Sequence, residues 1–191
     1  HAIRLARRAM TAGYWAGAVA SCQTTVDLSE NIGDRRTMAI AQLDQARCEA
    51  LLRHQDQARA MYRRVLDNPD APPSLAETAQ IEALMLALLD NDSTNAVAIL
   101  QARKGPPEGP LRDTLLCLGG EISAETLINS VESMPSRFRN DACLAAAVRF
   151  HLDGQARKAQ AALKRCIQTS TPPSEWPAPF ARLLYSRFGV D

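Results

Sequence analysis

The stretch that decides the fold runs from Ala147 to Cys166 and reads AVRFHLDGQARKAQAALKRC. Gly154 follows Ala147 by seven residues and precedes Ala159 by five, and Leu163 and Cys166 continue the pattern. Small and apolar residues therefore recur at helical spacing on both sides of a glycine. Gly154 readily takes the left-handed backbone conformation that ends a helix, and small side chains let two helices approach closely. The stretch predicts a helical hairpin.

The same arrangement recurs at three other places, and proline pairs punctuate the chain between them. The pairs stand at 72–73, 106–107 and 172–173, so that the first two are 34 residues apart and the third follows 66 residues later. Proline cannot continue a helix, and a fixed spacing of this kind indicates a repeat. The three further copies are Ala6, Gly13, Ala18 and Cys22; then Ala46, Ala58, Tyr62 and Val65; then Leu84, Ala96 and Leu100.

These residues resemble the motif of the tetratricopeptide repeat (TPR) family, and the resemblance covers nearly the whole chain. The last copy is the closest, with Pro172 one place late and Phe150 at the family's aromatic position. The first copy has no proline after it, and the second lacks the turn glycine and carries Glu49 at the aromatic position. The resemblance implies an α-solenoid, a right-handed superhelix of stacked hairpins.

We therefore expect a single helical-repeat domain over 1–191, with about five antiparallel hairpins and a C-terminal capping helix. The expected hairpins span roughly 3–29, 35–67, 74–104, 110–133 and 138–169, and the capping helix spans 177–188. Gly105 to Pro110 is interpreted as a linker, Ser123 as a helix N-cap, and 105–133 as a truncated or degenerate hairpin. The apolar stripe of the last helix is also compatible with a homodimer or another partner.

Composition agrees with this fold and excludes some functions. There are 32 Ala and 22 Leu, against 15 Val and Ile together, which favours an all-α chain. The net charge is +1, which argues against an electrostatic nucleic-acid binder. No apolar run reaches 18 residues, so we expect no membrane span.

No pattern for catalysis, metal or cofactor binding is found, so we expect a non-catalytic protein. The histidines, His1, His54 and His151, lack a ligand or catalytic spacing, and no G-x-S-x-G occurs. The chain has five cysteines, an odd number, and no two of them form a C-x-x-C motif. This pattern predicts buried, reduced thiols, and reduced thiols favour a cytoplasmic location. The chain begins with His1 instead of Met, so we expect it to be part of a longer protein.

The TPR resemblance implies a scaffold or adaptor whose concave groove, formed by the first helices of the hairpins, binds a peptide or helix of a partner protein. The Arg-rich and Ala-rich usage is compatible with a bacterial source. Two alternatives stay open: RNA binding through arginine-rich helix faces, and a regulatory role beside an enzyme domain. The residues expected to face the groove are Arg4, Arg7, Asp44, Arg47, Glu82, Met85, Val148 and His151.

Overall fold

The computed structural model of the chain describes residues 2–102, 111–170 and 176–188. The described residues contain helices and no strand, which confirms the all-α prediction. The 105–110 linker and the proline pairs at 106–107 and 172–173 lie outside the described residues. The helices are α1 (Ala2–Thr11), α2 (Trp15–Asn31), α3 (Arg35–Leu51), α4 (Gln55–Asp67), α5 (Pro73–Leu89), α6 (Ser93–Gln101), α7 (Arg112–Gly119), α8 (Ala124–Ser130), the 3-10 helix η1 (Val131–Ser133), α9 (Ser136–Leu152), α10 (Ala156–Thr169) and α11 (Ala178–Arg187).

The chain divides into two compact units, residues 1–83 and residues 84–191, with the boundary inside α5. Unit 1 holds α1 to α4 and most of α5, and unit 2 holds the end of α5 and the helices that follow. Whether the chain forms one continuous repeat domain stays a prediction.

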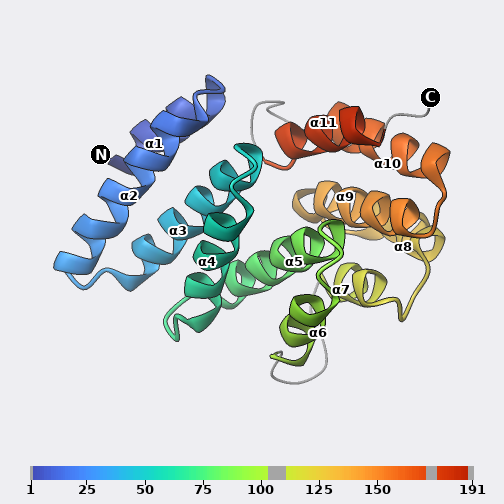
Figure 1. Ribbon diagram of the computed structural model, residues 1–191, viewed down its shortest axis with the longest axis horizontal. Coiled ribbons are helices and arrows are strands. Elements are labelled where there is room, and N and C mark those ends of the chain that lie inside the picture. The colour runs from blue at the N-terminus through green and yellow to red at the C-terminus, as the bar shows by residue number, and fades with distance from the viewer. Residues whose placement is uncertain (1, 103–110, 171–175, 189–191) are drawn as a thin grey trace. The chain divides into compact units, whose positions relative to one another are not determined.

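In unit 1, consecutive helices pack against one another: α1 against α2, α2 against α3, and α3 against α4 (Figure 1). The small residues that mark the repeat lie at these contacts. Ala6, Ala18, Cys22, Ala46 and Ala58 have no exposed surface. Side chains this small allow the helix backbones to approach closely, as the sequence pattern predicts.

In unit 2, α9 is the central helix and packs against α7, α8 and α10. Its residues from Ala142 to Val148 are buried, because neighbouring helices cover several of its faces. The last helix, α11, packs against α10 and buries Phe180, Leu184 and Phe188. Its place at the end of the described chain is that expected of a capping helix.

Four hairpin turns share one geometry, in which the residue seven positions after the first marked residue of the copy (Ala6, Ala46, Leu84 or Ala147) has positive φ. Gly13 and Gly154 have φ of 73° and 72°, and Arg53 and Asn91 have φ of 63° and 56°. In each turn the next residue donates its backbone N–H to the carbonyl five positions earlier, as His54 does to Glu49 at 2.9 Å. This is the Schellman arrangement that ends a helix. The second copy, which lacks the turn glycine, therefore makes the same turn with arginine.

Ser123 caps α8 as the sequence predicts, since its hydroxyl accepts a hydrogen bond from the backbone N–H of Thr126 at 3.1 Å. Asp34 and Asp92 do the same for α3 and α6. These bonds satisfy N–H groups that a helix start leaves without intrahelical partners. The starts of three helices are thus determined by local side chains.

The positive φ of Arg53 predicts that Arg53→Gly stabilises the protein by about 1 kcal/mol, because a non-glycine residue is strained in this conformation. Thermal or urea unfolding measures the change. Arg53→Ala is the matched control, since it removes the exposed side chain and keeps the strain, and should change stability by less than about 0.5 kcal/mol. Equal gains for Gly and Ala would show that the side chain and not the turn is responsible.

Candidate functional site

Four of the residues expected in the groove form one charged network within unit 1. Arg7 of α1 donates from Nε to Asp44 Oδ2 of α3 at 3.4 Å. One α3 turn later, Arg47 donates from Nη1 to the other oxygen of Asp44 at 3.4 Å and from Nη2 to Glu82 Oε1 of α5 at 2.7 Å. Tyr62 of α4 donates its hydroxyl to Glu82 Oε2 at 3.0 Å. The network therefore joins α1, α3, α4 and α5.

The inner end of this network is buried and the outer end is accessible. The exposed fraction of the side chain is 1% for Glu82 and 17% for Arg47, against 62% for Arg7. Burial raises the pKa of Glu82 and outweighs the hydrogen bonds from Arg47 and Tyr62. Burial alone lowers the pKa of Arg47, but the adjacent carboxylate of Glu82 more than offsets this, and the net shift is upward. The Arg47–Glu82 pair therefore acts within the core, and Arg7 is its accessible extension.

The other four expected groove residues lie apart from the network. Arg4 is exposed on α1, whereas Met85 and Val148 have no exposed surface. His151 stacks its ring on Phe188 of α11, with ring centroids 3.7 Å apart and planes 5° from parallel. Burial, and then the charge of Arg187, lower the pKa of His151. Arg4 and Arg7 are thus the accessible residues of the predicted set in unit 1.

Sequence reasoning did not find a hollow of about 470 Å³ in unit 1, lined by residues of α2, α3 and α4. Its lining includes Val26 and Glu30 of α2, Met38 and Gln42 of α3, and Arg64 and Asp67 of α4. Gln42 is buried, and its Oε1 has no hydrogen-bond partner among the residues that the structure describes. No local pattern marks this hollow, because its lining residues come from three helices.

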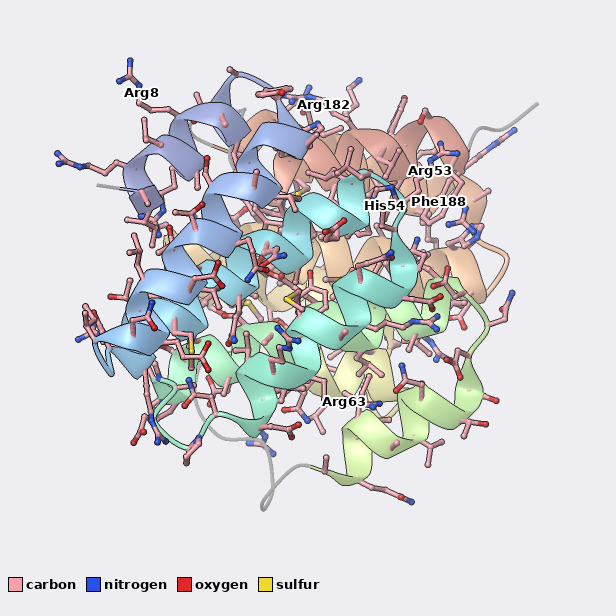
Figure 2. The ribbon with its side chains drawn as sticks, turned by 60° about the vertical axis from the view of Figure 1, so that its left-hand side comes forward. Arg8, Arg53, His54, Arg63, Arg182 and Phe188 are labelled. Carbon is pink, nitrogen blue, oxygen red and sulfur yellow. The ribbon has the colours of Figure 1, made fainter. Side chains whose placement is uncertain are left out.

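The arginine clusters that suggested RNA binding are partly neutralised. Arg35 pairs with Asp70 at 3.1 Å. In unit 2, Arg139 lies 3.4 Å from Glu132. Arg8 is exposed and points away from the ribbon of α1 (Figure 2). These clusters therefore offer a phosphate backbone fewer free charges than the sequence suggests.

All five cysteines are free and buried, which confirms the prediction of reduced thiols inside helices. Burial is the main cause that raises the pKa of Cys22, Cys117 and Cys166 to about 12 and that of Cys143 to about 11. Within the described residues, no three His, Cys, Asp or Glu side chains gather where they could hold a metal ion. Across the same part of the chain, no helix is both long and apolar enough to cross a membrane.

We predict that Arg47→Met lowers the free energy of unfolding by about 3 kcal/mol, because it leaves the buried carboxylate of Glu82 without its cation. The double variant Arg47→Met/Glu82→Gln should recover more than half of that loss, since no buried charge is left unpaired. Urea unfolding measures both. A single variant as stable as the parent would show that the pair does not hold α3 and α5 together.

Because the thiols are buried and their pKa values are raised, Ellman's reagent at pH 8 should modify none of the five cysteines within the time in which free cysteine reacts fully. In 6 M guanidinium chloride all five should react. The readout is absorbance of the released thiolate. A thiol that reacts rapidly in the folded protein would reveal an opening of its helix pair.

No family model matches the chain, and no match is found among curated proteins or among solved structures. What the protein does must therefore be inferred from its own residues. The most informative of these are the charged network that ends at Arg7 and the hollow beside Gln42.

Proposed function

We propose that the chain is a TPR-like helical-repeat module that binds a peptide or helical segment of a partner protein without catalysing a reaction. The observation that carries this proposal is the repetition of one hairpin design. The four turn residues Gly13, Arg53, Asn91 and Gly154 share the positive-φ geometry, and the small residues around them are buried. Packed helical hairpins make a rigid frame, and a rigid frame lowers the entropic cost of binding a peptide.

The accessible part of the expected groove in unit 1 supports a site with positive charge. Arg4 and Arg7 lie one helical turn apart on α1, and both are exposed. Arg7 donates to Asp44 from Nε alone, and its side chain is 62% exposed, so the rest of its guanidinium is accessible to a carboxylate. Met85 and Val148 are buried and contribute packing instead of contacts. We therefore propose that a partner segment carrying a carboxylate contacts Arg4 and Arg7.

The RNA alternative receives less support from the structure. Arg35, Arg139 and Arg165 pair with carboxylates, and each of these pairs would compete with a phosphate. An RNA complex would lose affinity steeply as salt rises. The calorimetry described below is therefore repeated with single-stranded RNA at low and at high salt. RNA binding that weakens steeply with salt would favour the RNA alternative, and no RNA binding at low salt would exclude it.

The test is selection from a phage-displayed library of random 12-residue peptides against the folded chain, followed by calorimetry with the synthesised peptides. We expect enriched sequences that bind with saturable one-to-one stoichiometry. The double variant Arg4→Glu/Arg7→Glu should weaken an acidic peptide bound along α1 about tenfold or more, because attraction becomes repulsion. Arg36→Glu is the matched control, since Arg36 is an exposed arginine of α3 outside the expected groove set.

If no peptide is enriched on the folded chain, peptide binding is the wrong function. If peptides bind but the double variant binds them unchanged, the function stands and the position along α1 is wrong. Circular dichroism of each variant confirms that it is folded.

A further inference from the structure

The hollow in unit 1 has features of a second binding site, separate from the exposed arginines of α1. It is formed by residues of three consecutive helices, α2, α3 and α4, and its volume of about 470 Å³ lies within the range of ligand pockets. Val26 and Met38 contribute apolar surface to its lining. Such a lining suits the aliphatic part of a bound chain.

Gln42 is the feature of this hollow that points to an occupant. Its side chain lines the hollow, the residue is only 5% exposed, and its amide makes no hydrogen bond within the described part of the chain. Buried polar groups in proteins are normally paired. Gln45, one turn along α3, is also buried, but its amide donates to Gln23 Oε1 at 3.3 Å. Gln45 Oε1 is likewise without a partner, so Gln42 differs in that neither the oxygen nor the nitrogen of its amide is paired within the described part of the chain.

The chemistry of a carboxamide defines what would pair with Gln42. A glutamine amide offers an acceptor oxygen and N–H donors on one planar group. A main-chain peptide group offers the complementary N–H and C=O. An extended peptide can present both to one side chain, since its backbone is not engaged in a helix. A water molecule is the simpler occupant and is distinguished by experiment.

The charges at the hollow indicate the character of such a peptide. Glu30 and Asp67 are exposed carboxylates that make no ion pair with the described residues. Of the two arginines in the lining, Arg35 pairs with Asp70, and Arg64 makes no ion pair within the described ranges. Two free carboxylates against one free guanidinium favour a ligand with positive charge.

We propose that this hollow holds an extended, basic peptide segment whose main-chain N–H and C=O groups pair with the amide of Gln42. The proposal rests on the proposed function in one respect, namely that the chain binds peptides. It differs in the surface used and in the sign of the ligand's charge.

The experiment repeats the 12-residue library selection against the folded Arg4→Glu/Arg7→Glu chain, in which the α1 site is disabled. We expect enriched peptides that are rich in Lys and Arg and that also bind the parent chain. Gln42→Leu should weaken these peptides about tenfold, the equivalent of two lost hydrogen bonds. The same substitution should raise the melting temperature of the free chain, because it removes an unpaired buried amide. If Gln42 served only to stabilise the fold, Gln42→Leu would lower the melting temperature instead.

Gln45→Leu is the matched control, since it alters a buried glutamine of the same helix outside the hollow, and should change peptide affinity less than twofold. Replacing single peptide bonds of the ligand by esters locates the bond that pairs with Gln42. At one position, the ester ligand should bind the parent chain more weakly than the all-amide peptide does. The Gln42→Leu variant should bind this ester ligand and the all-amide peptide equally well.

The outcomes separate this proposal from the proposed function. If no peptide is enriched on the Arg4→Glu/Arg7→Glu chain, or if Gln42→Leu binds the enriched peptides as the parent does, the hollow holds water only and the inference is wrong. Peptides that bind the parent along α1 would leave the proposed function intact in that case. If no peptide binds the parent at all, both are wrong.

Discussion

Close approach of helices through small side chains is the constraint on which the rest of this structure depends. Ala6 and Ala18 in the first hairpin, and Ala147 and Ala159 in the last, are fully buried. Alanine contributes little apolar area, so such a core is stable only if the backbones come near enough for many weak contacts. Tight turns hold the helices at that separation. This explains why Arg53 accepts a positive φ where glycine would be free of strain.

The same close packing explains the charged network of unit 1. A buried guanidinium needs a carboxylate at hydrogen-bonding distance, and α3 and α5 place Glu82 within 2.7 Å of Arg47. The pair is specific in geometry, because Arg47 approaches both oxygens of Glu82 while Tyr62 donates to one of them. Residues that the family resemblance assigns to a groove thus also hold helices together. Of the four network residues expected in the groove, Arg7 is the one whose side chain is mostly exposed.

Prediction from the sequence succeeded where the signal was local. The turn at Gly154 and the N-cap at Ser123 depend on residues a few positions apart, and the structure confirms them. Arg53 shows the limit of even this local pattern, since the second copy lacks glycine and yet makes the same turn. The burial of Met85 and Val148 depends on the packing of whole helices, and the sequence pattern could not distinguish it from a groove position.

The sequence by itself determined that this protein is a chain of helical hairpins, because helix propensity, turn glycines and small residues at helical spacing act over a few residues. The tertiary structure alone decided that Arg47 is paired and largely buried and that Arg7 remains accessible. It also decided that Gln42 lines a hollow with no hydrogen-bond partner among the described residues. The physical reason is that burial and pairing are properties of neighbours. Glu82 lies 35 positions from Arg47 in the chain, and only the packing of helices brings the two together.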